Sequence, residues 1–129
     1  MKINHVFLGL FLTLLSGCCK EETQNGLEGK WFLINASGGI AGISQDYPKG
    51  QIIWNFDDDD QLHITNNYTG NWNVSFPSQD LSYQIKETIE GDELILDNEY
   101  FGNILLQMED TLLISQAQFA DGFGFLFVK

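Results

Sequence analysis

The sequence predicts an all-β protein, a small antiparallel up-and-down β-barrel of about eight to nine strands. Apolar residues recur mostly at every second position from Leu27 onward, which is the period of a strand with one face buried. Clusters of Gly, Asn and Asp interrupt these runs roughly every eight to twelve residues, as in sandwiches and barrels. The short connections favour a meander, and closing it into a barrel removes the exposed edges that invite aggregation.

The alternation predicts nine strands, at residues 31–36, 51–56, 61–65, 71–76, 81–89, 93–97, 100–108, 111–116 and 122–128. In the first half of the barrel, the side chains expected to face inward are those of Ile52, Trp54, Phe56, Leu62, Ile64, Trp72, Val74 and Phe76. In the second half they are those of Leu81, Tyr83, Ile85, Ile89, Phe123, Phe125 and Phe127.

Four consecutive acidic residues, Asp57–Asp60, lie between the second and third predicted strands. Like charges side by side do not fit a strand ladder, so the run predicts a turn. Carboxylate oxygens are ligands that calcium prefers, but the run lacks the alternating ligand spacing and the Gly of an EF-hand loop. A solvated turn is therefore favoured over a metal site.

The longest connection, residues 37–50, joins the first predicted strand to the second. It exceeds a hairpin loop in length, and long ordered loops are often functional. Its large apolar residues are Ile40, Ile43 and Tyr47. They are candidates for a lid or a partner contact at the open end of the barrel, and equally for a plug that packs over its mouth.

Residues 1–17 have the organisation of a signal peptide. Lys2 gives a charged start, and Val6–Leu15 is an apolar run well short of the roughly 20 residues that a spanning helix needs. The sequence Leu15-Ser16-Gly17-Cys18 resembles a bacterial lipobox, in which cleavage before the Cys leaves its thiol to carry lipid. The resemblance implies lipidation of Cys18 and a stable attachment to the membrane.

Residues 18–27 are mostly polar and predict a lipidated, flexible tether that leads to a barrel domain at 28–129. Within the tether, Lys20-Glu21-Glu22 is similar to an export tag with which some Gram-negative bacteria display lipoproteins outside the outer membrane. We therefore expect a lipid-anchored protein of the outer membrane. The sequence leaves open whether it faces the cell surface or the periplasm.

The chain of 129 residues is strongly acidic, with 6 Lys, no Arg, 18 Asp plus Glu and a net charge of −12. Removal of residues 1–17 takes away Lys2 and leaves a net charge of −13. A chain without a basic patch cannot neutralise phosphates, which excludes nucleic acid as a partner. The same charge repels an anionic bilayer surface, so the barrel should stand off the membrane on its tether.

The sequence predicts a protein that is not an enzyme and that holds no metal or cofactor. His63 is the only His after residue 17, and between inward-facing Leu62 and Ile64 it should point outward. One exposed imidazole makes neither a metal cluster nor a catalytic triad. Nucleophile-elbow and metal-binding motifs are absent from the sequence. Carboxylate pairs assembled from separate strands are the catalytic arrangement that sequence leaves open.

Gly29-Lys30-Trp31 resembles the Gly-x-Trp signature of lipocalins, in which the Trp closes the bottom of an eight-stranded barrel. The motif opens the first predicted strand, before a long first loop and a series of meanders. Residues 27–129 as a whole resemble the small lipocalin-like lipoproteins of Gram-negative bacteria, including the final Asp121-Gly122-Phe123-Gly124-Phe125. The chain departs from lipocalins in having no helical segment after the last strand and no Arg to lie over the signature Trp.

Four aromatic residues are candidate ligand contacts: Trp31, Trp54, Tyr83 and Phe125. They either line an apolar cavity or fill the core, because an eight-stranded barrel is just filled by side chains or holds one small ligand. The leading hypothesis is a non-catalytic lipoprotein that binds a small apolar ligand or presents a loop as a binding surface. The alternative is an accessory subunit of an outer-membrane protein assembly, with a filled barrel.

Overall fold

The computed structural model describes residues 26–70, 76–116 and 121–129, and these residues form nine β-strands and no helix. The strands are β1 (Gly29–Gly38), β2 (Ile43–Asp46), β3 (Ile52–Phe56), β4 (Gln61–Asn66), β5 (Gln79–Thr88), β6 (Gly91–Leu96), β7 (Glu99–Gln107), β8 (Thr111–Ser115) and β9 (Phe123–Val128). All of their pairings are antiparallel. The predicted all-β class is confirmed.

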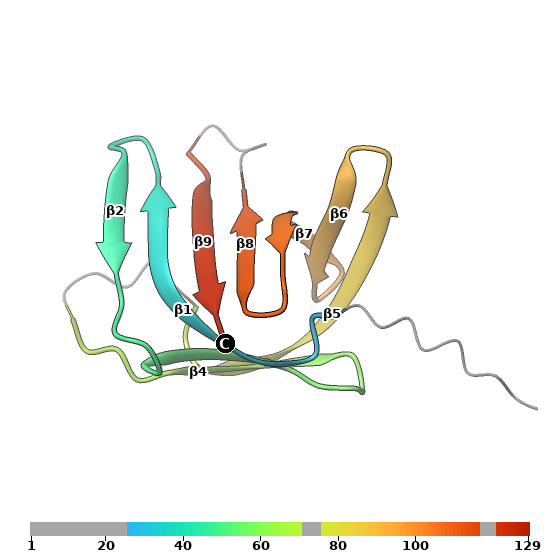
Figure 1. Cartoon of the computed structure of the whole chain (residues 1–129), viewed down its shortest axis with the longest axis horizontal. Coiled ribbons are helices and arrows are strands. Elements are labelled where there is room, and N and C mark those ends of the chain that lie inside the picture. The colour runs from blue at the N-terminus through green and yellow to red at the C-terminus, as the bar shows by residue number, and fades with distance from the viewer. Residues whose placement is uncertain (1–25, 71–75, 117–120) are drawn as a thin grey trace, which may run out of the picture.

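The strands follow the order β2-β1-β3-β4-β5-β6-β7-β8-β9, and β9 returns to pair with β1. Eight strands therefore close a barrel, and β2 is an additional strand beside β1 (Figure 1). From β3 to β9, each strand pairs with the next one along the chain. The predicted up-and-down barrel is confirmed.

β1 is long enough to pair with three other strands. Its first part, Gly29–Phe32, pairs with β3, and its last part, Asn35–Gly38, pairs with β2. Along the opposite edge it pairs with β9, with a shift of register between Leu33 and Asn35. A shift of this kind bends a strand, and Figure 1 shows β1 curving from the lower end of the barrel to the upper end.

The connection 37–50 contains a strand that the sequence analysis missed. β2 folds back on β1 as a hairpin, and the Asn35 side-chain amide donates hydrogen bonds to Ser44 and to Asp46 across the pair. The expectation of a strand-free connection was wrong, because β2 is short and its sequence, Ile-Ser-Gln-Asp, carries only one apolar residue. Its pairing depends on β1 instead of on a buried apolar face.

Two further expectations concern the ends of predicted strands. Residues 71–75, which include the expected inward-facing Trp72 and Val74, lie outside the described residues, whereas Phe76 packs against the core ahead of β5. Ile89 was expected to face inward and is instead fully exposed. β5 ends at Thr88, and Ile89 lies in the turn to β6, where no core lies opposite it.

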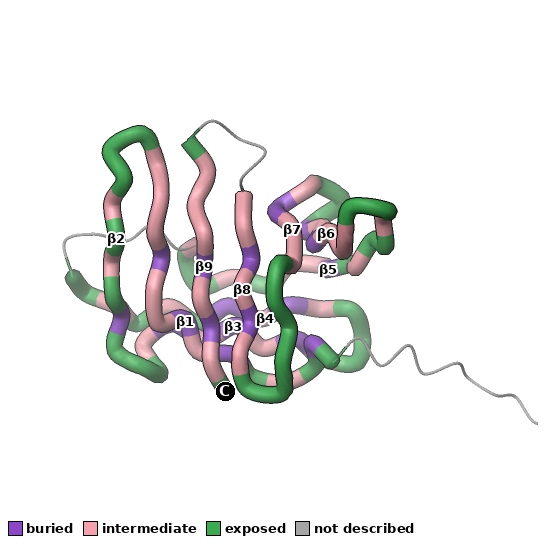
Figure 2. The backbone as a smooth tube through the Cα atoms, turned by 45° about the horizontal axis from the view of Figure 1, so that its top comes forward, coloured by how far each residue is buried: buried purple, intermediate pink, exposed green. Residues whose placement is uncertain are grey.

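The remaining inward-facing residues lie where the alternation places them. All eleven are buried or pack against the buried core: Ile52, Trp54, Phe56, Leu62, Ile64, Leu81, Tyr83, Ile85, Phe123, Phe125 and Phe127. Figure 2 shows buried positions alternating with less buried ones along β3, β4, β8 and β9. Leu27, which we placed at the end of the tether, is fully buried and is the first core residue along the chain.

β5 continues beyond its pairing with β4. β4 covers Gln79–Ser82 of β5, and the backbone N–H of Tyr83 still donates to the carbonyl of Asp60. Farther along, the described residues contain no strand on that side, although β6 pairs on the other. The β5–β6 hairpin therefore projects toward the upper end of the barrel with one free edge (Figure 1).

Candidate functional site

Trp31 and Trp54 lie opposite each other on β1 and β3, and both are fully buried. The indole Nε1 of Trp31 donates a hydrogen bond of 2.8 Å to the carbonyl of Leu27. The Nζ atom of Lys129, the last residue, lies 4.6 Å from the centre of the Trp31 ring. A cation over an indole face is an attractive arrangement. Trp31 is therefore contacted by Leu27, just before the first strand, and by Lys129, just after the last.

Trp54 lies at the centre of the aromatic core. Its ring centroid lies 5.0 Å from that of Phe127, 5.5 Å from Phe101, 6.0 Å from Phe76 and 6.3 Å from Phe56. Around Trp54, the interior is therefore filled by side chains. Such a cluster contributes to stability through both buried area and ring geometry.

A cavity of about 270 Å³ opens beside this cluster, between the start of β5 and the turn from β6 to β7. Its lining includes Phe76, Leu81 and Phe101 together with Asp97 and Glu99. Phe76 and Leu81 are only partly buried, so the cavity joins the core to solvent. The arrangement combines apolar walls with a polar rim, which is the usual composition of a small-molecule site.

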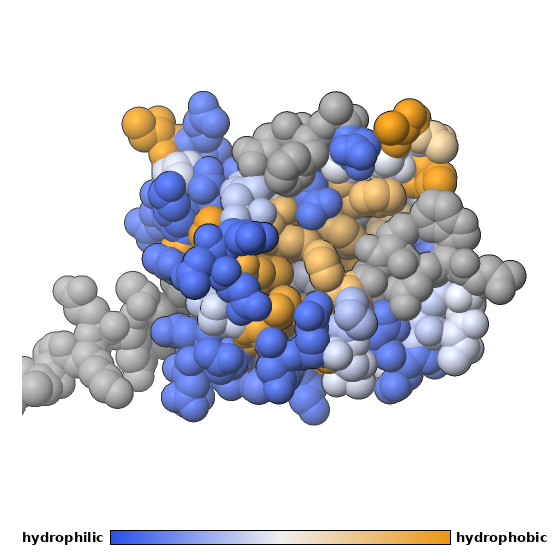
Figure 3. Space-filling model, turned by 180° about the vertical axis from the view of Figure 1, so that it is seen from behind, coloured by the Kyte–Doolittle hydropathy of each residue, from blue (hydrophilic) through white to orange (hydrophobic). Residues whose placement is uncertain are grey.

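Aromatic rings continue from this cavity across the inner face of the sheet. Phe101 stacks on Phe125 with centroids 5.6 Å apart and planes at 29°, and the ring of Phe123 follows 6.3 Å from Phe125. We name Phe76, Phe101, Phe125 and Phe123 the aromatic row. Figure 3 shows apolar surface in the hollow of the rear face, bordered by hydrophilic side chains.

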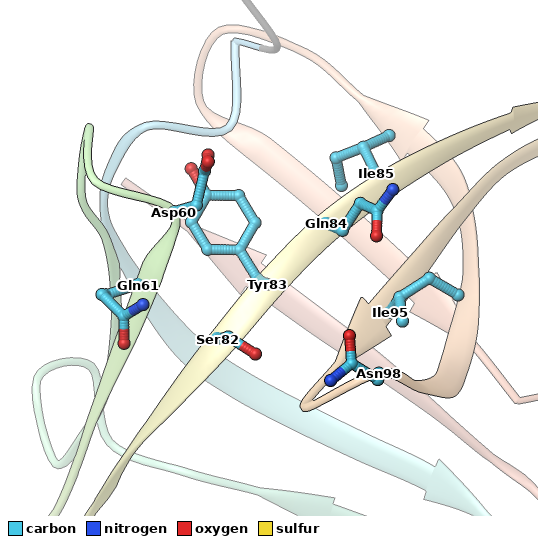
Figure 4. A pocket seen from close by; sticks show the side chains of 8 residues that line it. All are labelled: Asp60, Gln61, Ser82, Tyr83, Gln84, Ile85, Ile95 and Asn98. Atoms are coloured by element: carbon cyan, nitrogen blue, oxygen red, sulfur yellow. The ribbon is translucent and has the colours of Figure 1, made fainter.

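A second cavity, of about 380 Å³, lies where β4 begins and β5 continues past it (Figure 4). It is mainly polar, with Gln61, Ser82, Gln84 and Asn98 among its lining residues. Tyr83 also lines it, and its hydroxyl donates a 3.0 Å hydrogen bond to the backbone carbonyl of Asp57.

Carboxylates gather around the Tyr83 end of this polar cavity. Burial, and after it the negative charges of Asp60, Glu28, Asp57 and Asp58, together raise the pKa of the Tyr83 hydroxyl to about 12. A negative environment of this kind opposes ionisation of the phenol. Tyr83 is therefore a neutral hydrogen-bond donor throughout the physiological range, which suits a structural role.

His63 points outward from β4, as predicted, but it is half-buried and two carboxylates hold it. Its Nδ1 lies 2.7 Å from Asp80 of β5, and its Nε2 lies 2.8 Å from Asp57 of the acidic turn. These hydrogen bonds, first that of Asp80 and then that of Asp57, raise the pKa of His63. The hydrogen bond from His63 is also the main cause of the lowered pKa of Asp57.

The acidic run forms the predicted turn. The Asp57 carboxylate accepts backbone N–H groups of Asp59 and Gln61, both at 2.9 Å. Such side-chain-to-backbone bonds are a property of turns. Over the described ranges, no group of three or more His, Cys, Asp or Glu side chains could hold a metal ion.

The three apolar residues of segment 37–50 occupy different environments. Ile40 lies at the tip of the β1–β2 hairpin with 91% of its surface exposed, and Ile43 begins β2. Tyr47 is buried, with its ring edge-on to Tyr68 at 4.9 Å and its backbone N–H donating to Ile34. Of the three, Ile40 is therefore the most accessible to a partner, Ile43 is partly accessible and Tyr47 is not.

The predicted anchor lies outside the described residues, as do Cys18 and Lys20-Glu21-Glu22. Across the part of the chain that is described, no helix is long and apolar enough to cross a membrane.

The sequence did not predict the contact of Lys129 with Trp31 or the two carboxylates that bind the ring of His63. It also did not predict that Phe76 and Phe101 line a cavity. The pairing of His63 with Asp80 could have been predicted if the register between the two strands had been known, because the two residues lie directly opposite each other. Comparisons with models of known families, with curated proteins and with solved structures gave no match for this chain.

Proposed function

We propose that this protein is a lipid-anchored, non-catalytic, lipocalin-like lipoprotein of the outer membrane that binds a small apolar molecule. The observation that carries the proposal is the cavity of about 270 Å³ that opens onto the aromatic row. Within it, Phe76 and Leu81 are partly buried apolar groups that a ligand would remove from water.

The size and lining of the cavity favour a compact ligand. At about 30 Å³ for each water-sized group, the cavity takes roughly nine non-hydrogen atoms. Asp97 and Glu99 at the rim disfavour an anion. We therefore favour a neutral, mainly apolar molecule.

The environment of Trp31 supports the resemblance to lipocalins. The resemblance implies a cationic side chain over the signature Trp, and in this chain the Lys129 ammonium occupies that place. Lys129 thus supplies the positive charge that an Arg supplies in lipocalins, although Lys lacks the flat guanidinium that stacks on a ring.

Ligand binding is tested by replacing Leu81, a cavity wall, with Ser. The matched control is Leu113→Ser, because Leu113 is also half-buried in a strand but lines neither described cavity. The probe is 2-octanone, with binding followed by NMR on the protein from residue 20 onward. We expect Leu81→Ser to weaken binding about tenfold and the control to leave it nearly unchanged. Equal affinities in the two variants would place the ligand elsewhere.

A second candidate function is that of an accessory subunit in an outer-membrane protein assembly. The residue through which such a contact would run is Ile40, whose apolar side chain is 91% exposed at the hairpin tip. Ile40→Ser should then release a co-purifying outer-membrane protein in detergent extracts, whereas Ile89→Ser, at another exposed tip, should retain it. Retention by both variants would contradict a contact through Ile40.

Lipid anchoring through Cys18 is tested by fractionation of cells. Cys18→Ala should move the protein from the membrane fraction to the soluble fraction, and Cys19→Ala should not. A protein that stays with membranes after a carbonate wash despite Cys18→Ala would rule out the lipobox.

Replacing Lys20, Glu21 and Glu22 by Ala should abolish cleavage by added protease on whole cells if these residues direct surface display.

A further inference from the structure

Trp54 carries a fully buried hydrogen-bond donor that has no acceptor. Among buried side-chain nitrogen and oxygen atoms of the described residues, only its Nε1 lacks a partner. An indole N–H can donate but not accept, and a buried one normally finds an acceptor. The unmet donor is therefore an exception that calls for a physical explanation.

Trp31 shows that the barrel can satisfy an indole at the same depth. It lies directly opposite Trp54, is equally buried, and donates from Nε1 to the carbonyl of Leu27 at 2.8 Å. The two facing Trp side chains thus differ in one respect. The indole N–H of Trp31 has an acceptor within the chain, and the indole N–H of Trp54 has none.

Two walls of the aromatic cavity pack against the ring of Trp54. Phe76 and Phe101 both contact the Trp54 ring and both line the cavity. Phe76 is only partly buried, whereas Phe101 is buried, so Phe76 is the ring that a ligand reaching the indole from the cavity would have to displace. Phe56 and Phe127, which also contact Trp54, offer no conventional acceptor.

We infer that the ligand of the aromatic cavity carries a neutral hydrogen-bond acceptor, a carbonyl or ether oxygen on an apolar body, that accepts the N–H of Trp54. The inference rests on the proposed function, because it names the ligand chemistry of the same cavity. Asp97 and Glu99 in the lining disfavour a carboxylate as the acceptor. An oxygen placed there satisfies Trp54 while the rest of the ligand covers Phe76 and Leu81.

The test compares two probes of almost equal shape, 2-octanone and 2-methyl-1-octene, in which a carbonyl is exchanged for a methylene group. Binding to the protein from residue 20 onward is followed by ¹H–¹⁵N NMR of the indole N–H signals, with Trp54→Phe used to assign the signal of Trp54. The ketone should bind about tenfold more tightly than the alkene, the value of one net hydrogen bond. It alone should move the Trp54 signal downfield.

The variants separate the inference from the function. Trp54→Phe should bind both probes with equal affinity, whereas Trp31→Phe should keep the preference for the ketone. Equal binding of the two probes by the unmodified protein, with the Trp54 signal unmoved, would overturn the inference and leave the apolar site standing. Failure of both probes to bind would overturn the proposed function itself. The shift measured on the unmodified protein decides the question even if a variant does not fold.

Discussion

At the scale of single residues, His63 links two segments through charge. It bridges Asp80 of β5 and Asp57 of the acidic turn, so its protonated form is favoured in the folded state. The pKa of His63 is higher in the folded state than its unfolded value of about 6.5, so protonation stabilises the folded state. This stabilisation is fully present below about pH 6.5, and it is lost as the pH rises through the folded-state pKa. For Asp57, whose pKa is lowered, the contribution is present above about 3.9 and is lost as pH falls through the folded pKa.

The first prediction is a stability difference that depends on pH. His63→Gln should reduce the free energy of unfolding at about pH 5.5, and the difference from the unmodified protein should vanish by about pH 9. Urea denaturation followed by circular dichroism measures it at both pH values. An equal difference at both would show that His63 acts through packing and not through charge. NMR titration of Asp80→Asn should also show a lower pKa for His63.

The second prediction contrasts the two facing indoles. Trp31→Phe leaves the carbonyl of Leu27 without its donor, whereas Trp54→Phe removes a donor that has no partner. Both changes remove a similar volume from the core. We expect Trp31→Phe to be more destabilising by about 1–3 kcal/mol, the cost of an unmet buried group. Urea denaturation followed by circular dichroism measures both, and equal losses would refute the argument.

At the scale of elements, the free edge of β5 has a definite hydrogen-bond pattern. Asp97 donates to the carbonyl of Ser82, which makes 82 and 97 a hydrogen-bonded pair. Because such pairs alternate along an antiparallel ladder, Gln84 and Lys86 bond to β6. The backbone groups of Ile85 and Glu87 then point to the edge that no described strand covers.

The third prediction follows from that alternation. In hydrogen exchange measured by NMR, the amides of Ile85 and Glu87 should exchange faster than those of Gln84 and Lys86. The four residues are neighbours on one strand and therefore serve as controls for one another. Uniform protection along β5 would mean that another segment pairs with this edge.

At the scale of the whole molecule, charge repulsion opposes compactness. The predicted mature chain carries −13, and the two ion pairs of the described residues both involve His63. Like charges spread over a small barrel repel one another, and salt screens that repulsion. We therefore expect the acidic surface to reduce stability at low ionic strength.

The fourth prediction is a melting temperature that rises with salt. Between about 0.01 M and about 0.15 M NaCl the screening length falls from roughly 30 to 8 Å, so Tm should increase. A variant with Asp58 and Asp59 replaced by Asn should start from a higher Tm and respond less to salt. Differential scanning calorimetry measures both, and a Tm that falls on adding salt would contradict the account.

Much of the barrel was predictable because side-chain direction in a strand is local. The inward positions of β3, β4 and β9 follow from alternation alone. β2 was not predictable in this way, since its few side chains have no buried face and depend on β1. Ile89 fits the alternating pattern but is exposed, because the pattern in the sequence continues one residue beyond Thr88, where β5 ends.

The candidate site was less accessible to sequence reasoning. Trp54 and Phe125 are buried as expected, but the cavity walls Phe76 and Phe101 come from the segment before β5 and from β7. Which aromatic side chains meet depends on the register of several strands, and a shift by one residue turns each side chain to the other face.

By itself, the sequence determined the strand class, the inward faces of most strands and the acidic exterior, because these depend on neighbours along the chain. Closure of the barrel and the registers of its strands decided the rest. Closure brings Lys129 over Trp31, the register of β4 against β5 places Asp80 beside His63, and several registers together surround Trp54 with rings that offer its N–H no conventional acceptor. These contacts join residues far apart in sequence, and only the pairing of β1 with β9 and the registers between the strands bring them within bonding distance.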